Sequence, residues 1–286
     1  MAQSSDKNCL HCFGHIAPKA FMARTIDKVA IFMDPIFIFL IVCPLVFVAG
    51  FIDAIAGGGG LISLPAYLIT GLPVHTCLGT NKLSSCMGTA VATLRYALQG
   101  FVEVKRCAVC VVFALAGSAL GANIALMIDD AVFRVIMLVV VPITAAYIMF
   151  HKDFKEKEPI APAKSLALCA AISAVVGVYD GVYGPGTGTF LTLLFMGVGH
   201  LKLTQATGTC KVVNLATNVA ALTVFISNGV VWLPLGLVAG CFNMLGAYIG
   251  TRCFIGKGVR IARPVMLTVL VIFFVKLLLE VTGVIS

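Results

Sequence analysis

Residues 50–85 read GFIDAIAGGGGLISLPAYLITGLPVHTCLGTNKLSS, an apolar stretch interrupted by four consecutive glycines from Gly57 to Gly60. An acid, Asp53, precedes the interruption, and Lys82 lies in the next apolar segment. Glycine destabilises a helix and lets the backbone adopt unusual angles. Within lipid, irregular backbone is tolerated only where it faces protein or a water-filled cavity. We therefore expect this stretch to form half of a substrate site inside a membrane.

The composition predicts an all-α polytopic membrane protein. Of the 286 residues, 60% are hydrophobic and only 11% are charged, whereas a soluble domain carries about 25% charged residues. So few charges cannot cover a water-facing surface. The net charge of +8 would suggest nucleic acid as the partner of a soluble chain. Here the basic residues gather between apolar runs, which indicates orientation in a bilayer and no nucleic-acid partner.

The first 35 residues are a polar or weakly amphipathic tail. In this tail Cys9 and Cys12, with His15 nearby, have the spacing of metal ligands, but no second pair closes a four-ligand site. We expect a disordered tail or an interfacial helix, with no metal and no cofactor. The eleven cysteines lie mostly in apolar segments, where free cysteine behaves as a small buried hydrophobe, so no disulfide framework is predicted.

Ten apolar segments follow the tail. About 20 helical residues cross a bilayer, so 59–71 and 188–200 are too short and are predicted to be half-helices or re-entrant limbs. One long, charged, proline-bearing loop at 151–165 divides the chain near its middle. The segments lie at approximately 36–56, 59–71, 78–98, 107–128, 131–150, 166–183, 188–200, 207–227, 231–251 and 264–283.

The second half of the chain resembles the first. When Asp180 is laid on Asp53, an offset of 127 residues, GVYDGVYGPGT matches GFIDAIAGGGG, and at an offset of 129 residues Lys211 falls on Lys82. So many coincidences indicate internal duplication. The same register superposes two G-x-x-x-G pairs, which predict close helix packing: Gly117/Gly121 and Gly246/Gly250. The predicted divisions are the tail (1–35), a first repeat (36–150), the connecting loop (151–165) and a second repeat (166–286).

Charge indicates that the two repeats are inverted. The connection at 99–106 is basic, but its counterpart at 228–235 carries no charge; the connection at 128–134 is acidic, but its counterpart at 252–263 is basic. Opposite bias in equivalent loops is expected when they lie on opposite sides of the membrane. The predicted cytoplasmic loops are 103–106, 151–165 and 252–263, with both termini outside. If the short segments do not cross, eight spans in parallel repeats are the alternative.

Few ionisable groups lie well inside the apolar segments. A charge at the bilayer centre costs about 2.5–3.5 kcal/mol on the insertion scale, so Asp53, Lys82, Asp180 and Lys211 are candidates for substrate or proton handling. We expect the lysines to bind an anion and the acids to carry the coupling ion. The alternative is structural: an Asp–Lys pair within each repeat pins the helix break, or each Asp caps its broken helix. Arg95 is expected to reach the interface by snorkelling.

The two glycine-rich breaks should each start a short helix. A helix N-terminus presents unpaired backbone N–H groups and the positive end of the helix dipole, which together suit a small anion. The alternative is that the breaks are tight turns between packed helices. Asn81 and Asn214 add polar groups near the lysines, and interhelical hydrogen bonding is an equal alternative for them. The predicted substrate-binding residues are Gly57, Gly58, Gly59, Gly60, Asn81, Lys82, Gly184, Gly186, Gly188, Lys211 and Asn214, with Asp53 and Asp180 as coupling residues.

Four motifs resemble those of a known family. GFIDAIAGGGGLISLPA, GTNK, GVYDGVYGPGTG and TGTCK followed by NLATN look like the TauE/SafE (sulfite-exporter-like) membrane transporters, in particular the YfcA-type members. The resemblance covers about 36–283 and leaves out the tail; the second lysine motif reads TGTCK where the first reads GTNK. It implies a bacterial inner-membrane secondary carrier, with members linked to sulfite, sulfonates and related organosulfur anions.

Residues and resemblance together predict a secondary transporter for a small sulfur-containing or carboxylate anion, not an enzyme. No GK[ST] sequence follows the glycines and no βαβ context surrounds them, so an ion gradient and not ATP is expected to supply energy. The expected partners are the lipid bilayer and the substrate; no oligomeric state is predicted. A passive anion channel is one alternative. An integral-membrane redox protein is another, but it would need clustered ligands or paired thiols, whereas the five histidines are scattered.

Overall fold

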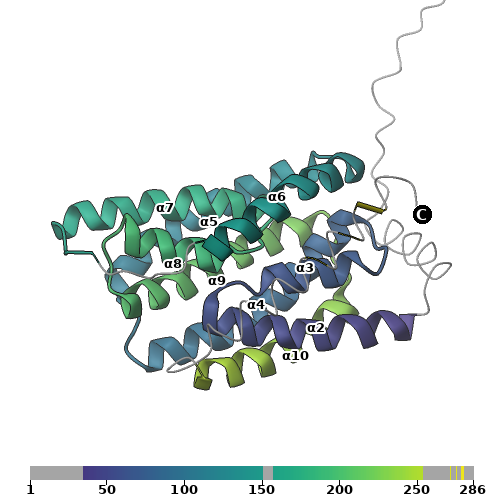
Figure 1. The fold of residues 1–286 in the computed structure, drawn as a ribbon, viewed down its shortest axis with the longest axis horizontal. Helices are drawn as coiled ribbons and strands as arrows, with labels where there is room; N and C mark the ends of the chain where they lie inside the picture. The colour runs from purple at the N-terminus through teal and green to yellow at the C-terminus, as the bar shows by residue number, and fades with distance from the viewer. Residues whose placement is uncertain (1–34, 151–156, 254–270, 272–274, 276–277, 280–286) are drawn as a thin grey trace, which may run out of the picture.

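The structure of the protein, a computed structural model, describes residues 35–150 and 157–253 together with 271, 275, 278 and 279. Within these ranges the regular structure is entirely helical, without a strand, as the composition predicts (Figure 1). The N-terminal tail with its Cys9/Cys12 pair lies outside the described residues. Most of the predicted segment at 264–283 lies outside them too.

The helices of the described part match the predicted apolar segments to within a few residues. In chain order they are α2 (Pro35–Ala56), α3 (Gly60–Leu68), α4 (Val74–Leu98), α5 (Val104–Leu126), α6 (Asp130–Phe150), α7 (Pro162–Val182), α8 (Thr187–Gly197), α9 (Leu203–Ser227) and α10 (Leu233–Cys253).

Two helices are short, and both begin where the sequence predicts a break. The backbone leaves α2 at Gly57 with φ of +74°, and α3 follows with only 9 residues. It leaves α7 through Gly184 and Gly186, with φ of +92° and +83°, and α8 follows with 11 residues. Residues other than glycine rarely adopt such φ values, so the glycines allow the chain to turn at both breaks. The prediction that each break starts a short helix is confirmed.

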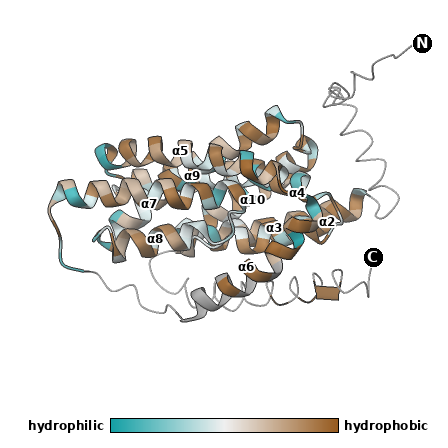
Figure 2. Cartoon of the chain, turned by 90° about the horizontal axis from the view of Figure 1, so that it is seen from above, coloured by the Kyte–Doolittle hydropathy of each residue, from teal (hydrophilic) through white to brown (hydrophobic). Residues whose placement is uncertain are grey.

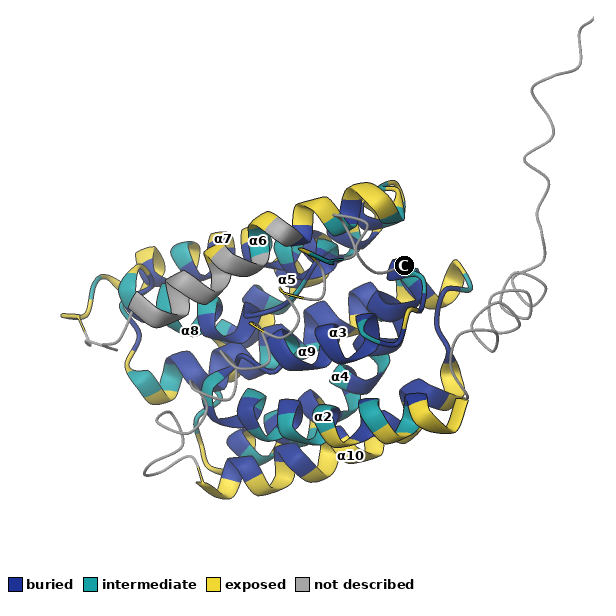
Figure 3. Ribbon diagram, turned by 45° about the vertical axis from the view of Figure 1, so that its right-hand side comes forward, coloured by how far each residue is buried: buried dark blue, intermediate teal, exposed yellow. Residues whose placement is uncertain are grey.

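The outer surface of the bundle is suited to lipid. Five helices of the described part, α2, α5, α7, α9 and α10, are long and apolar enough to cross a membrane. Hydrophobic residues predominate along the helices (Figure 2). Large apolar side chains are exposed on the outer helices, whereas α3 and α9 in the middle are mainly buried (Figure 3). Apolar side chains exposed on this scale indicate a multi-pass membrane protein.

Small residues bring two helix pairs into backbone contact. A Cβ atom at Gly250 of α10 would lie 2.5 Å from the Phe51 carbonyl oxygen of α2. On the other side of the molecule, a Cβ atom at Gly121 of α5 would lie 3.0 Å from Cα of Gly181 in α7. Because such approaches leave no space for a side chain, the predicted packing role of the G-x-x-x-G pairs is confirmed.

The connections gather at two opposite ends of the bundle. At one end the start of α4 meets the α5–α6 and α9–α10 connections: the Val74 amide donates to the Asp130 carboxylate at 3.1 Å, and the Trp232 amide donates to the Thr80 hydroxyl at 3.0 Å. A further contact of 2.8 Å between His75 Nδ1 and the carboxylate of Asp130 strengthens this junction.

At the other end the α6–α7 and α8–α9 connections meet. His200 Nδ1 lies 2.7 Å from the Glu158 carbonyl oxygen, and the Ser165 hydroxyl donates to the Gly199 carbonyl oxygen at 2.5 Å. Phe101, in the α4–α5 connection, packs against Gly208 in the second turn of α9. In Figure 1, α2 and α7 run in opposite directions from these two ends, so their glycine breaks meet in the middle of the bundle.

Candidate functional site

A small cavity lies where the two glycine breaks meet. Its volume is about 30 Å³, and a water molecule needs about 10–15 Å³ on the same scale, so a few waters or a compact ion would fill it. Most of the predicted site residues line it: Asp53, Gly57, Gly59, Gly60, Asn81, Lys82, Asp180, Gly184, Gly188 and Asn214. The structure does not place Gly58, Gly186 or Lys211 in the cavity wall.

The breaks touch each other backbone to backbone. A Cβ atom at Gly188 would lie 2.5 Å from the Gly57 carbonyl oxygen, so neither position has space for a side chain. The Thr189 amide donates to that same carbonyl at 3.1 Å, and the Thr189 hydroxyl donates to the Ala56 carbonyl oxygen at 2.9 Å. One of the α8 amides predicted to face an anion is therefore already bonded to the first half of the chain.

The N-terminus of α3 has more open donors. The amides of Gly58, Gly59 and Gly60 have no acceptor among the described residues. No side chain caps α3 at Gly59 or α8 at Gly186. The alternative that Asp53 and Asp180 cap the broken helices by accepting backbone N–H bonds is wrong, because the partners of both carboxylates in the described part of the chain are side chains.

The first ion pair joins Lys82 of α4 to Asp180 of α7. Their side chains are 4% and 3% exposed, and Lys82 Nζ lies 2.6 Å from Asp180 Oδ2. Lys82 Nζ also donates to Asn218 Oδ1 at 3.1 Å, while Asp180 Oδ1 accepts from the Thr187 hydroxyl at 2.7 Å. An ammonium has three donors, so one N–H of Lys82 remains for the cavity that this residue lines.

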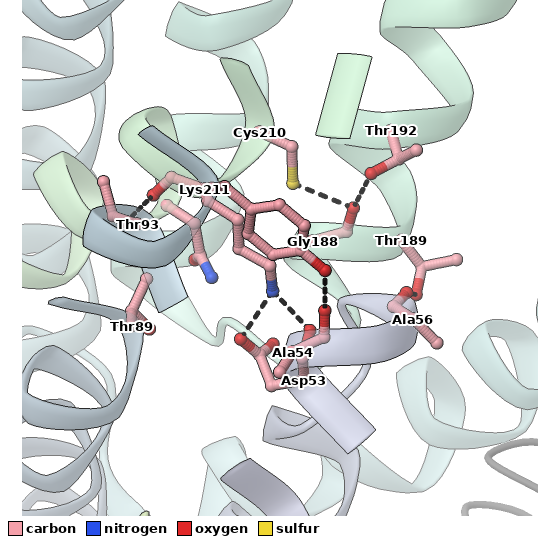
Figure 4. Close-up of polar contacts among 12 residues, drawn as sticks. Asp53, Ala54, Ala56, Thr89, Thr93, Gly188, Thr189, Thr192, Cys210 and Lys211 are labelled. Carbon is pink, nitrogen blue, oxygen red and sulfur yellow. Dashed lines mark hydrogen bonds and ion pairs between the residues drawn. The ribbon is translucent and has the colours of Figure 1, made fainter. Parts of the chain in front are cut away.

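The second ion pair joins Lys211 of α9 to Asp53 of α2 and is arranged differently. Lys211 Nζ lies 2.8 Å from Asp53 Oδ2 and also donates to the Asp53 carbonyl oxygen (Figure 4). Lys211 is 2% exposed, but the Asp53 side chain is 18% exposed and lines the cavity. Asp53 Oδ1 has no hydrogen-bond partner in the described part of the chain. Asp53 thus separates Lys211 from the cavity.

Each ion pair connects the two halves of the chain. The expected structural alternative, an Asp–Lys pair within each repeat, is wrong in its partners, because Lys82 bonds to Asp180 and Lys211 to Asp53. In each half an acid precedes the glycine break and a lysine follows it. Helix packing nevertheless pairs each lysine with the acid of the other half. Two positive and two negative charges cancel, so a carboxylate balances the charge of each lysine in this structure.

Uncharged polar groups in the wall are incompletely bonded. Asn81 Oδ1 and Ser63 Oγ are buried and have no partner among the described residues. Asn214 Oδ1 lies 3.5 Å from Asn218 Nδ2, which is a weak contact. An unsatisfied buried polar group costs about 1–3 kcal/mol, so these groups mark a space that a polar ligand or water completes.

Sequence reasoning missed several members of the wall, namely Ser63, Thr89, Thr187 and Asn243. Thr187 directly follows the second break, a position that could have drawn attention to it. Asn243 is a lone amide inside an apolar segment, which was also visible in the sequence. Arg95 lies outside the cavity, with its guanidinium 4.6 Å from the Tyr248 ring centroid.

The metal-ligating side chains and the thiols of the described residues bear on the redox alternative. Within them no three His, Cys, Asp or Glu side chains are placed to hold a metal ion, and the nine cysteines they include are free thiols. The Cys210 thiol, at the position equivalent to Asn81, lies 3.2 Å from the Gly188 carbonyl oxygen beside the second break (Figure 4).

Comparison with known proteins identifies the chain's relatives. A family model described as "Sulfite exporter TauE/SafE" matches residues 42–277. A "Probable membrane transporter protein ORF9" of Sinorhizobium is 36% identical over 236 residues, 82% of this chain and 90% of the relative. A "Probable membrane transporter protein" of Haemophilus influenzae is 33% identical, covering 77% and 86%. "Probable membrane transporter protein YfcA" of Escherichia coli is 32% identical, covering 82% and 87%. No solved structure matches significantly.

Proposed function

This chain belongs to the sulfite exporter TauE/SafE family of membrane transporters, and we propose that it is a secondary carrier that moves a small anion through the cavity between the helix breaks. The observation that carries this proposal is the cavity itself, which is a polar space among apolar helices. Its wall contains both the uncapped N-terminus of α3 and the buried Lys82. Family membership supports transport; the cavity chemistry supports an anion.

The proposed binding groups are the α3 amides at Gly59 and Gly60, the third N–H of Lys82, and the Asn81 side chain. Backbone N–H groups at a helix N-terminus suit an anion without requiring a full positive charge. The cavity volume of about 30 Å³ favours a compact sulfur oxyanion or short carboxylate over an extended organosulfonate in this state.

We assign the coupling proton to Asp53. Because the two ion pairs leave no net charge, an entering anion makes the cavity negative unless a proton accompanies it. Protonation of Asp53 would release Lys211 and restore the balance. The charged and titratable groups around Asp53 are Lys211 and the Cys210 thiol of α9, Tyr96 of α4, and the Lys82–Asp180 pair across the cavity. The Tyr96 hydroxyl donates to the Ala54 carbonyl oxygen.

Asp180 is less suited to this role. Both of its carboxylate oxygens are bonded, and its side chain is 3% exposed. Asp53 has one oxygen without a described partner and faces the cavity. Exposure to the substrate space and a free lone pair both favour Asp53 as the acid that exchanges a proton.

We further propose that the halves are inverted repeats in a bacterial inner membrane, with the basic loops cytoplasmic. The reciprocal ion pairs support this, as do the paired packing of α2 with α10 and of α7 with α5. The placement of the 99–103 and 228–232 connections at opposite ends of the bundle also agrees with inversion. Inverted repeats with broken helices at the midplane are typical of secondary transporters.

Uptake into proteoliposomes tests the proposed function. The purified protein is reconstituted and offered sulfite, sulfate, a two-carbon sulfonate and acetate, each with and without an inward proton gradient. A secondary carrier gives saturable uptake of at least one compact anion, and the proton gradient increases accumulation. Absence of uptake for every anion would contradict transport of this class, and a non-saturating, uncoupled conductance would identify a channel instead.

A further inference from the structure

One side chain of the cavity wall, Asn243, is not explained by the ion pairs or the helix breaks. It lies in the middle of α10, is 5% exposed as a residue, and lines the cavity. Its side-chain amide has no hydrogen-bond partner anywhere in the described ranges. Because buried polar groups are almost always bonded, an open amide at a cavity surface indicates a place for a ligand or water.

Two glycines make the space that this amide occupies. A Cβ atom at Gly50 of α2 would lie 2.6 Å from Asn243 Oδ1, and one at Gly88 of α4 would lie 2.6 Å from Asn243 Cγ and overlap its oxygen. Any larger residue at either position would displace the amide. Two separate helices therefore leave room for Asn243 beside the cavity.

The amide has no counterpart in the other half of the chain. The register of the predicted repeats places Ala114 of α5 at the position of Asn243 of α10. Ala114 is fully buried and does not line the cavity. A Cβ atom at Gly177, the counterpart of Gly50, would lie 3.0 Å from the Ala114 carbonyl oxygen, so the two helices pack directly there. The α5–α7 crossing therefore packs without an amide at the position that Asn243 occupies in the α2–α10 crossing. Packing alone does not explain the amide, and we attribute its presence to the cavity that it lines.

We propose that Asn243 is a substrate-contacting residue, whose amide N–H donates to an oxygen of the bound oxyanion. The inference rests on the proposed function, since it assigns a further ligand to the same site. With Asn243, a third helix, α10, joins α3 and α4 in binding the anion. The site is then asymmetric between the two halves, because α5, the counterpart of α10, has Ala114 at this position. An oxyanion presents several acceptor oxygens in fixed directions, so a neutral donor on a separate wall selects for shape as well as charge.

Substitution of Asn243 tests this role. Asn243→Leu keeps the volume approximately but removes the amide, and Asn243→Asp keeps the shape but adds a negative charge. Gly88→Ala keeps the asparagine at position 243 but puts a Cβ atom where its side-chain amide lies, so the amide is displaced. Asn123→Leu is the matched control, because Asn123 is an exposed amide on α5 that bonds only its own helix. Uptake of radiolabelled sulfite, with acetate in parallel, is measured in proteoliposomes.

We expect Asn243→Leu and Gly88→Ala to raise the half-saturating anion concentration about tenfold or more, as for a lost hydrogen bond to a charged group. Asn243→Asp raises it further, because a carboxylate repels the anion. The melting temperature of Asn243→Leu, which removes a buried amide without a described partner, stays at the wild-type value, and the control variant Asn123→Leu keeps both the wild-type melting temperature and the wild-type half-saturation. Wild-type half-saturation in both Asn243 variants would overturn the assignment, and so would a lowered melting temperature with unchanged half-saturation. If the wild-type protein takes up none of the four anions of the screen above, the proposed function fails first and the inference falls with it.

Discussion

Charged residues in apolar segments are the most informative single positions in this chain. Asp53, Lys82, Asp180 and Lys211 could be selected from the sequence because a charge in lipid is costly and therefore rare without a reason. Their partners could not, because the choice between acids depends on how the two halves pack. Asn243 was not selected because, unlike Asn81 and Asn214, this neutral amide does not lie near one of the two lysines in the sequence.

The difference between the two acids leads to a prediction. Asp53→Asn keeps an oxygen that accepts from Lys211 but cannot exchange a proton, so accumulation driven by a proton gradient should be lost while anion exchange remains. Asp180→Asn should keep coupling and lower the melting temperature, because the buried Lys82 charge loses its counter-charge. Both are measured by gradient-driven uptake and counterflow in proteoliposomes. Coupled accumulation in Asp53→Asn together with its loss in Asp180→Asn would reverse the assignment.

At the scale of elements, the glycine breaks fix where the short helices begin. The sequence was sufficient to predict these starts, because consecutive glycines both destabilise a helix and permit positive φ. It was not sufficient to predict that the breaks touch, with the Thr189 amide bonded to the Gly57 carbonyl oxygen. Contact between segments so distant in sequence follows from tertiary packing, which local pattern does not encode.

Alanine substitution should distinguish glycines that are needed for the contact between the breaks from glycines with free space around them. Gly188→Ala places a Cβ atom 2.5 Å from the Gly57 carbonyl oxygen, so we expect a clearly lower melting temperature in detergent and loss of uptake. Gly57→Ala should do the same, with about 1–2 kcal/mol added for left-handed backbone at φ of +74°. Gly197→Ala, in the last turn of α8 with no atom within 4 Å of a new Cβ, is the control and should be neutral or slightly stabilising. Normal melting and uptake in Gly188→Ala would contradict the contact.

For the whole molecule, charge bias between equivalent loops predicts inverted repeats, and the fold has the corresponding loops at opposite ends. Composition was enough to predict a helical membrane protein, since 11% charged residues cannot cover a soluble surface. Loop charge could not by itself exclude parallel repeats, because short segments that fail to cross would change the number of spans.

Topology reporters distinguish the two arrangements. Fusions after Gly100 and after Glu158 should both score cytoplasmic, because these connections share one end of the bundle and carry basic residues. A fusion after Asn228 should score external. Alkaline phosphatase and green fluorescent protein, used in parallel, report the two sides. A cytoplasmic signal at Asn228 would favour parallel repeats.

Transport by a variant without the Lys82 charge tests most directly whether the cavity is the anion site. Lys82→Met alone would leave Asp180 unpaired, at a cost of about 3–5 kcal/mol, so the measurement uses the neutral double variant Lys82→Met/Asp180→Asn, with exposed Lys164→Met as control. Saturable sulfite uptake is compared at equal amounts of reconstituted protein. We expect the double variant to require about 10–100-fold more sulfite for half-saturation, the loss of one charged hydrogen bond, while the control behaves as wild type. Wild-type half-saturation in the double variant would contradict binding of the anion in this cavity.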